Sequence, residues 1–278
     1  MTISPLVGAF NVELSNIPSD KSISHRCAIL AVLSNDTSIV ENYLEAEDTI
    51  CSLNIIKKLG FKVIREGKKL MIIPSSKKLE LENMKFDCGN SGTTIRIFSG
   101  LLATLNGSFE LYGDQYLMKR PMDRVVNPLK EIGCDIKTSK DGKYPPIHIK
   151  SSKINGFNFK AKIASAQVKS ALILAGLQAT STSYYEEEIK TRNHTENMLI
   201  DMGANIESNN NKIIINPMKQ TLKPLNIVVP SDPSSAFFFA VATCIIPNSS
   251  IVLKNISLNE TRIEAFKILE QMGAKISY

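Results

Sequence analysis

Residues 55–64 of this 278-residue chain read IIKKLGFKVI, and the pattern in this stretch occurs three more times. An amphipathic helix ends at a glycine, and after two further residues a β-branched residue begins a strand. The other copies are LKEIGCDIK at 129–137, LIDMGANIE at 199–207 and LEQMGAKIS at 269–277, with the glycines 73, 70 and 70 residues apart. Glycine in this place is typical of a left-handed helix cap. The sequence therefore predicts four copies of one structural unit.

A second element recurs with the same period. Small and hydroxylated residues precede a strongly apolar helix in PSDKSISHRCAILAVL (18–33), CGNSGTTIRIFSGLLATL (88–105), ASAQVKSALILAGL (164–177) and PSDPSSAFFFAVATCII (230–246). A strand follows each run, and a pair of strands follows each of the first three glycine caps. The unit is predicted to be β-α-β-α-β-β, which gives an α/β (α+β) fold. The apolar helix should be buried, and the amphipathic helix should lie on the surface.

The fourth unit reaches only the first strand of its closing pair, at residues 273–278. The three earlier units all continue into a second strand. Folded proteins avoid an unpaired sheet edge and an uncovered apolar face. We therefore expect that the sequence is truncated, or that another chain completes it.

Composition indicates an ordinary globular protein, with 43% hydrophobic and 22% charged residues and a formal net charge of +6. The five cysteines are widely spaced, which favours neither zinc nor disulfides and fits a cytoplasmic location. No signal peptide is evident. The most apolar stretch, residues 236–246, is too short to cross a bilayer and is predicted to be a buried helix.

The starts of the apolar helices are the candidate binding elements. The N-terminus of a helix presents unpaired N–H groups and a partial positive charge, which suit a phosphate or a carboxylate. Ordinary N-capping explains any one of these starts. Four starts on a common period predict that equivalent helix ends are aimed at one shared point.

At the first helix start, Ser22 and Arg26 are four residues apart and share one helix face. With Lys21 beside them they form a candidate oxyanion site, whereas His25 is interpreted as structural. At the second start, Gly92 allows backbone N–H groups to approach an anion closely. No GKS or GKT is present there, so a nucleotide site is not indicated.

Two further segments offer polar donors. Arg120 directly precedes Pro121, which holds it out of helical geometry and fixes the direction of a bidentate donor. A surface salt bridge is the ordinary explanation of such an arginine. Gln167, at the third helix start, can donate to and accept from a ligand hydroxyl. The segment TRNHTE at 191–196 is interpreted as another helix start.

Six blocks together carry a family resemblance: KSISHR, GNSGTTIR, the GD…RPM block at 113–122, SAQVKSALILAGL, TRNHTE and VPSDPSSAFFF. In this order they resemble the 5-enolpyruvylshikimate-3-phosphate (EPSP) synthase family over essentially the whole chain. The resemblance implies a two-domain inverse α/β barrel with three units in each domain. It places a complete domain at 21–226 and an incomplete second domain at 1–20 plus 227–278. Tyr116 stands where the family usually has serine, and Ala166 stands where part of the family has serine.

The resemblance implies transfer of the enolpyruvyl (1-carboxyvinyl) group of phosphoenolpyruvate to the 5-hydroxyl of shikimate-3-phosphate, without a cofactor or a metal. This reaction releases phosphate and belongs to chorismate and aromatic amino-acid biosynthesis. Gly92 and Arg120 would bind phosphoenolpyruvate, Lys21 would face both substrates, and most of the others would hold shikimate-3-phosphate. The substrate-binding residues that it implies are Lys21, Ser22, Arg26, Gly92, Thr93, Arg120, Ser165, Ala166, Gln167, Thr191 and Arg192.

Lys21 is the one catalytic candidate, because the family's catalytic aspartate, glutamate and second lysine belong to later repeats whose motifs do not occur here. The chain alone is therefore expected to hold shikimate-3-phosphate weakly and to be inactive. The resemblance implies a monomer when the protein is complete, with no binding to nucleic acid or membrane.

Several alternatives stay open from the sequence. A UDP-N-acetylglucosamine enolpyruvyl transferase shares the fold but would show a reactive loop cysteine and lacks the KSISHR and GNSGTT blocks. An RNA-end cyclase would need a nucleophilic histidine, and His25, His148 and His194 offer no obvious one. A nucleic-acid binder would need a basic stripe with interleaved aromatic residues, which is not evident. A non-catalytic anion-binding module is harder to separate from an enzyme.

Overall fold

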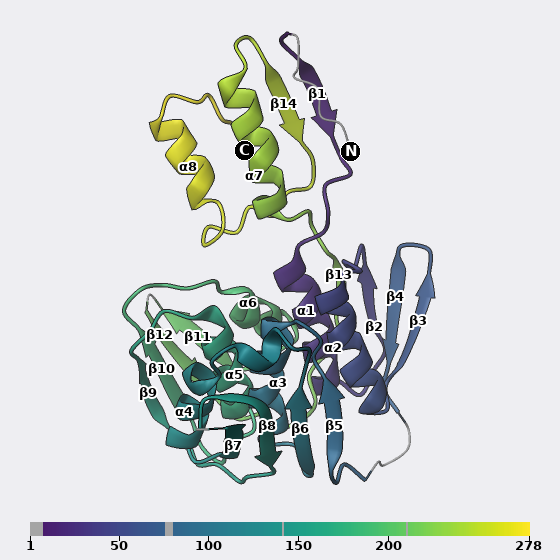
Figure 1. Ribbon diagram of the computed structural model, residues 1–278, viewed down its shortest axis with the longest axis vertical. Helices are drawn as coiled ribbons and strands as arrows, with labels where there is room; N and C mark the ends of the chain where they lie inside the picture. The colour runs from purple at the N-terminus through teal and green to yellow at the C-terminus, as the bar shows by residue number, and fades with distance from the viewer. Residues whose placement is uncertain (1–7, 76–79, 141, 210) are drawn as a thin grey trace.

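The computed structural model describes residues 8–75, 80–140, 142–209 and 211–278. It consists of a large lobe and a small lobe that two extended segments connect (Figure 1). The large lobe contains three four-stranded sheets and helices α1 to α6, and the small lobe contains a two-stranded sheet with helices α7 and α8. Among the described residues, no helix combines the length and apolar character that crossing a membrane requires.

The three sheets of the large lobe have the same topology. In each, the first two strands are parallel and the remaining pairs are antiparallel. This arrangement confirms the predicted β-α-β-α-β-β unit. In spatial order the strands are β13 (Asn226–Val228), β2 (Ser38–Glu41), β4 (Lys69–Ile73) and β3 (Lys62–Glu66); β5 (Met84–Asp87), β6 (Ser108–Tyr112), β8 (Tyr144–Lys150) and β7 (Asp135–Lys140); and β9 (Asn158–Ala161), β10 (Ser183–Glu187), β12 (Lys212–Ile215) and β11 (Ile206–Asn209).

The two ends of the chain exchange strands between the lobes. The first strand of the first sheet is β13, which comes from near the end of the sequence and lies parallel to β2. In the same way β1 (Asn11–Leu14) lies parallel to β14 (Ser250–Leu253) in the small lobe. From β1 onward, the described chain thus begins in the small lobe, builds the large lobe and returns. Because β13 still pairs with β2, residues 227 and 228 lie in the large lobe, just beyond the boundary that the resemblance implied.

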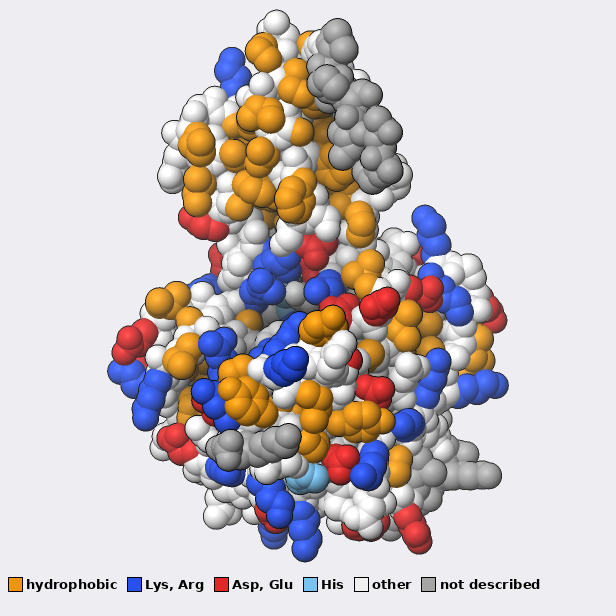
Figure 2. All heavy atoms as spheres, viewed as in Figure 1, with side chains coloured by type: hydrophobic (Ala, Val, Ile, Leu, Met, Phe, Trp, Pro, Cys, Tyr) orange, Lys and Arg blue, Asp and Glu red, His pale blue; other side chains and the backbone are white. Residues whose placement is uncertain are grey.

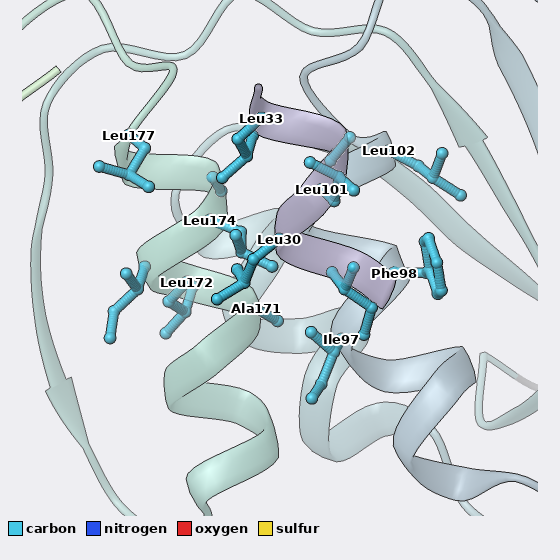
Figure 3. Packing of buried hydrophobic residues seen from close by; sticks show 14 of the residues in the cluster. Leu30, Leu33, Ile97, Phe98, Leu101, Leu102, Ala171, Leu172, Leu174 and Leu177 are labelled. Carbon is cyan, nitrogen blue, oxygen red and sulfur yellow. The ribbon is translucent and has the colours of Figure 1, made fainter. Parts of the chain in front are cut away.

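The apolar helices of the large lobe are buried, as predicted. These are α1 (Lys21–Leu30), α3 (Gly92–Leu102) and α5 (Ala166–Gly176). Leu30, Leu101 and Leu174 meet between them (Figure 3). The α3 and α5 backbones are so close that a Cβ on Gly100 would lie 2.0 Å from a carbonyl oxygen of α5. The amphipathic helices α2 (Glu47–Lys58), α4 (Asp123–Glu131) and α6 (His194–Asp201) surround this bundle.

The predicted glycine caps are confirmed. Each of the four repeat glycines follows a helix with a φ between +90° and +104°, a conformation that glycine adopts without steric cost. The fourth follows α8 (Glu264–Gln271), but residues 274–278 form no strand. The strand predicted there is therefore wrong for this structure, since a strand requires a hydrogen-bonded neighbour. The glycines are Gly60, Gly133, Gly203 and Gly273.

The prediction of a buried helix at 236–246 is wrong. Helix α7 (Pro233–Ile245) buries only Pro233, Ala236 and Ala240, and Phe238 is 78% exposed. The reason is packing, because among the described residues α7 packs mainly against α8 and the two-stranded sheet, whereas α1, α3 and α5 cover one another. Figure 2 shows the resulting apolar side chains on the surface of the small lobe.

Candidate functional site

Three helix starts in the large lobe carry the residues that the sequence singled out. Helix α1 begins at Lys21, α3 at Gly92 and α5 at Ala166. Asp20, Ser91 and Ser165 act as N-caps, each accepting a hydrogen bond from a backbone N–H in the first turn. A side-chain cap satisfies one N–H of the first turn, so each start keeps further N–H groups and a partial positive charge.

The starts of α3 and α5 are connected through Gln167. Its Nε2 donates to Thr93 Oγ1 at 2.9 Å, and its Oε1 accepts from Arg96 Nη1 at 3.0 Å. The structure therefore brings together Thr93 and Gln167, two of the predicted site residues, and their contact with a substrate stays a prediction. Arg96 was missed, although it lies four residues after Gly92 and so on the same helix face.

Two guanidinium groups lie over Gly92. A Cβ at this position would lie 2.7 Å from Arg96 Nη1 and 3.4 Å from Arg120 Nη1. Arg120 has the extended backbone expected before a proline, and its Nη2 donates to Asn90 Oδ1 at 2.5 Å. Burial lowers the pKa of Arg96, and the neighbouring Arg124 and Arg120 lower it further. An anion placed beside Gly92 would relieve this repulsion between cations.

The start of α1 is connected to the segment before α6. Arg192 Nη1 donates to Ser22 Oγ at 3.3 Å. Thr191 is held by Glu187, which accepts from its N–H at 3.0 Å and from its Oγ1 at 2.7 Å. Burial lowers the pKa of Arg192, as does the positive charge of Arg262. The structure thus places Ser22, Thr191 and Arg192 next to one another.

Arg26 lies beneath this surface and is only 3% exposed. Its Nε donates to Thr195 Oγ1 at 2.7 Å, its Nη2 to Ser170 Oγ at 2.8 Å and its Nη1 to the Ser22 carbonyl at 2.9 Å. Burial lowers its pKa to about 10, so that it stays cationic at neutral pH. These bonds use three of the five N–H donors of a guanidinium. Arg26 therefore fixes the backbone of Ser22, and its contact with a ligand stays a prediction.

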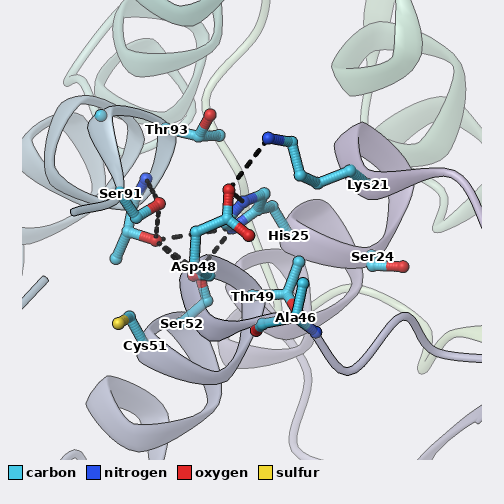
Figure 4. Close-up of polar contacts among 12 residues, drawn as sticks. Lys21, Ser24, His25, Ala46, Asp48, Thr49, Cys51, Ser52, Ser91 and Thr93 are labelled. Carbon is cyan, nitrogen blue, oxygen red and sulfur yellow. Dashed lines mark hydrogen bonds and ion pairs between the residues drawn. The ribbon is translucent and has the colours of Figure 1, made fainter. Parts of the chain in front are cut away.

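A polar network surrounds Lys21 (Figure 4). Lys21 Nζ lies 3.0 Å from Asp48 Oδ2, and His25 Nε2 lies 3.7 Å from the same oxygen. His25 is fully buried, and its Nδ1 lies 2.9 Å from Ser52 Oγ. Contacts with His25 and Lys21 lower the pKa of Asp48, whereas burial lowers the pKa of His25. His25 is thus a buried structural group, as interpreted, and Asp48 fixes the position of the Lys21 ammonium.

A buried ion cluster supports the segment that carries Arg192. Lys169 Nζ lies 2.8 Å from both Glu187 Oε1 and Glu196 Oε1, and it donates to the Thr191 carbonyl at 3.1 Å. All three charged side chains are at most 3% exposed. Burial raises the pKa of Glu196, with Lys169 opposing this shift. No local sequence pattern indicated this cluster, since Lys169 lies within an apolar helix.

The predicted site residues therefore come from several segments that hydrogen bonds connect. Lys and Arg side chains gather where the large lobe faces the small lobe (Figure 2). This gathering suits a ligand that carries more than one negative charge. Within the described ranges, no three or more His, Cys, Asp or Glu side chains form a group that could hold a metal ion.

Comparison with known proteins identifies the family. The family model for EPSP synthase (3-phosphoshikimate 1-carboxyvinyltransferase) matches residues 7–278. The whole chain is 50% identical to a 3-phosphoshikimate 1-carboxyvinyltransferase of Campylobacter curvus, covering 65% of that protein. A 3-phosphoshikimate 1-carboxyvinyltransferase of Sulfurimonas denitrificans is 50% identical over 97% of this chain, which covers 63% of that relative.

The fold agrees with a solved structure of EPSP synthase from Acinetobacter baumannii. The TM-score is 0.86 at 34% sequence identity, over 97% of this chain and 61% of that chain. The chain thus spans slightly less than two thirds of the length of the relatives that it matches. The chain belongs to the EPSP synthase (3-phosphoshikimate 1-carboxyvinyltransferase) family and has its two-domain α/β fold.

Proposed function

We propose that this chain forms the shikimate-3-phosphate side of an enolpyruvyl transfer site. One observation carries the proposal, namely that hydrogen bonds connect the start of α3 to that of α5 and the start of α1 to the segment before α6, and that cations surround these helix starts. Two phosphorylated acids need such a concentration of N–H donors and guanidinium groups. The reaction that the names of the curated relatives give, 1-carboxyvinyl transfer to 3-phosphoshikimate, uses two substrates of this kind.

The proposed domain division follows the two apolar cores. One core runs from Ile23 to Val229, and the other contains Ile17, Ala236 and Phe266. Separate cores are expected of separate domains. They support a complete domain at about 21–226, which β13 extends to about Val229. The second domain would be formed by 1–20, of which 1–7 lie outside the described residues, plus the chain after this crossing up to 278.

Shikimate-3-phosphate would lie across the starts of α1 and α5. Its phosphate would accept hydrogen bonds from Ser165, from the backbone at Ala166 and from Arg192. Its ring hydroxyl groups would meet Gln167 and Ser22, since an amide and a hydroxyl can both donate and accept. Thr191 and Arg26 would support these contacts from behind.

Phosphoenolpyruvate would lie at the start of α3. Backbone N–H groups at Gly92 and Thr93, with the guanidinium groups of Arg96 and Arg120, would hold its phosphate and carboxylate. Lys21 would reach both substrates, with Asp48 fixing its Nζ. This arrangement would bring the two reactants together without a metal or an organic cofactor.

The reaction would proceed by addition and elimination. The 5-hydroxyl oxygen forms a bond to C2 of phosphoenolpyruvate, its proton leaves, and C3 takes up a proton. The bond from C2 to the phosphate oxygen then breaks, C3 loses a proton, and phosphate departs. Lys21 is the proton-transfer candidate at this site, with its Nζ held 3.0 Å from Asp48 Oδ2. Because further acids and bases are needed, we expect this chain to bind shikimate-3-phosphate without turnover.

Titration calorimetry tests this proposal. Shikimate-3-phosphate should bind with one-to-one stoichiometry, and the double variant Gln167→Ala/Arg192→Met should weaken binding by about 100-fold. Lys254→Met is the matched control, because this lysine forms an exposed pair with Glu13 in the small lobe and should bind as the wild type does. UDP-N-acetylglucosamine should give no heat of binding, and phosphate release from both substrates should stay at background. The absence of shikimate-3-phosphate binding, or binding that the double variant leaves unchanged, would refute the proposal.

A further inference from the structure

The two segments that connect the lobes contain the same three residues, Pro-Ser-Asp, at 18–20 and 230–232. They lie antiparallel, with Ser19 bridged to Ser231. The Asp20 N–H donates to the Pro230 carbonyl and the Asp232 N–H donates to the Pro18 carbonyl, both at 2.8 Å. The crossing between the lobes is therefore a short, nearly symmetric pair of strands.

Each aspartate of this pair caps a helix in a different lobe. Asp20 accepts from the Ile23 N–H at 3.0 Å and caps α1. Asp232 accepts from the Ser234 N–H at 2.8 Å and caps α7. Two helices therefore begin at neighbouring carboxylates, one at the proposed substrate site and one in the small lobe.

Arg262 lies between these carboxylates. Its Nη1 is 3.0 Å from Asp20 Oδ2 and its Nη2 is 2.9 Å from Asp232 Oδ1, with Ser234 Oγ also at 2.9 Å. The arginine side chain is 5% exposed, and those of Asp20 and Asp232 are 0% and 12% exposed. The planar guanidinium group of an arginine can donate hydrogen bonds to two carboxylates at once, which the ammonium group of a lysine does less well.

The loop that carries Arg262 also contacts the large lobe next to Arg192. Asn259 Nδ2 donates to Asn193 Oδ1 at 2.7 Å, and Lys190 Nζ lies 2.7 Å from Glu260 Oε1. Arg262 Nη1 lies 3.4 Å from His194 Nε2. The same loop therefore touches both sides of the segment that supplies Thr191 and Arg192.

Apolar packing contributes little to the angle between the lobes. Their cores are separate, and a cavity of about 720 Å³ borders both connecting segments, at residues 15–19 and 228–231. The polar cluster around Arg262 is thus the main buried connection among the described residues at this crossing.

We propose that Arg262 is a positioning residue that fixes the small lobe relative to the large lobe by bridging the two helix-capping carboxylates. It would thereby hold the start of α7 and the 259–262 loop opposite the substrate site. The relevance to substrate binding rests on the proposed function, whereas the effect on lobe geometry does not.

Removal of Arg262 would leave two carboxylates facing each other. Burial raises the pKa of Asp20, Arg262 opposes this shift, and Asp232 reinforces it. His194, Arg192 and Arg26 are the other titratable or charged groups that act on this cluster. In a variant without Arg262, the repulsion between the Asp20 and Asp232 carboxylates should be strongest at high pH. It should weaken at lower pH, as one of the two carboxyl groups takes up a proton.

Double electron–electron resonance, which measures the distribution of distances between two spin labels, tests the proposal. One label is placed on the native, exposed Cys244 in the small lobe. The other is placed on Lys57→Cys, at an exposed position of α2, in a Cys51→Ser background; the remaining cysteines are buried. The protein with Arg262 should give one narrow distance distribution at both about pH 8 and about pH 5.5.

The Arg262→Met variant should give a broader or displaced distribution at about pH 8 that narrows at about pH 5.5. Arg262→Met/Asp20→Asn should restore the narrow distribution at high pH, because asparagine keeps the N-cap and removes the charge. Arg262→Lys should be intermediate, and Lys254→Met should match the parent. Circular dichroism checks that each variant is folded; if Arg262→Met does not fold, Arg262→Lys and the double variant decide the outcome.

The proposal would be overturned if the distances between the two spin labels in Arg262→Met equalled those in the parent protein. So would a displacement that is the same at both pH values and that Asp20→Asn does not correct. Calorimetry adds a second readout, since Arg262→Met should weaken shikimate-3-phosphate binding by about tenfold and Lys254→Met should not. If the parent binds no shikimate-3-phosphate, the proposed function fails, and the distances still decide the role of Arg262.

Discussion

Lys169→Met removes the only ammonium group of the buried ion cluster behind Arg192 and keeps a side chain of similar length. The change leaves Glu187 and Glu196 with side chains that are 3% and 1% exposed and without their cation at 2.8 Å. Removal of one partner from a buried ion pair typically costs about 3–5 kcal/mol. Arg26 still acts on Glu196, so we expect a loss near the lower end, about 3 kcal/mol, in the free energy of unfolding of the large lobe.

The loss should depend on pH. Burial already raises the pKa of Glu196 with Lys169 present, and removal of the lysine should raise it further. A carboxyl group whose pKa is higher in the folded than in the unfolded state stabilises the fold below its unfolded pKa, and this contribution is lost as pH rises through the folded pKa. The destabilisation of Lys169→Met should therefore shrink between about pH 7 and about pH 5, and Glu196→Gln in the same chain should recover part of it.

Urea unfolding followed by far-ultraviolet circular dichroism measures this change. Hydrogen exchange of peptides from α1 and α5 assigns the transition to the large lobe. Lys160→Met is the matched control, because the side chains of Lys160 and of its partner Glu188 are 64% and 76% exposed. This exposed pair should contribute less than about 0.5 kcal/mol to the free energy of unfolding. A loss below about 1 kcal/mol at neutral pH, or one that is equal at both pH values, would refute the reasoning.

Three further changes test other parts of the structure. Gly92→Ala would place a Cβ 2.7 Å from the Arg96 guanidinium, so phosphoenolpyruvate binding should weaken about tenfold while the fold persists. Calorimetry measures this binding, and an unchanged affinity would contradict the proposed site. Phe238→Ser should reduce the fluorescence of a bound apolar dye and change the free energy of unfolding by less than about 0.5 kcal/mol, since the ring is 78% exposed; an unchanged signal would show that α7 is covered. Burial and neighbouring arginines lower the pKa of His194 to about 3 from 6.5, so the free energy of unfolding measured in urea should fall as pH drops below 6.5. His194→Asn should flatten this pH dependence, and an equal slope in the variant would contradict the lowered pKa.

The sequence predicted the repeated unit because local physics determines most of it. A helix that ends at a glycine such as Gly60 has the same cap wherever it occurs, and strand pairs follow from short-range alternation. Strand exchange between the lobes is different, since the pairing of β13 with β2 joins distant segments. The exposure of α7 was missed for a related reason, because composition shows what a helix could bury and not what lies beside it.

The site was predictable where a motif fixes the backbone. Gln167 and Thr93 each lie in the first turn of a helix, and the repeat brings these turns together. Asp48, Lys169 and Arg262 gave no local signal, because each is an ordinary charged residue in its own segment. Their roles come from partners that only the tertiary structure supplies.

The most direct test of the central proposal is a crystal structure of this chain with shikimate-3-phosphate bound. We predict that the phosphate lies between the start of α5, at Ser165 and Gln167, and the guanidinium of Arg192, with the ring against Ser22. Binding instead on the outer face of the β5-β6-β8-β7 sheet, where Lys85, Lys137 and Lys150 line a separate cavity, would contradict it.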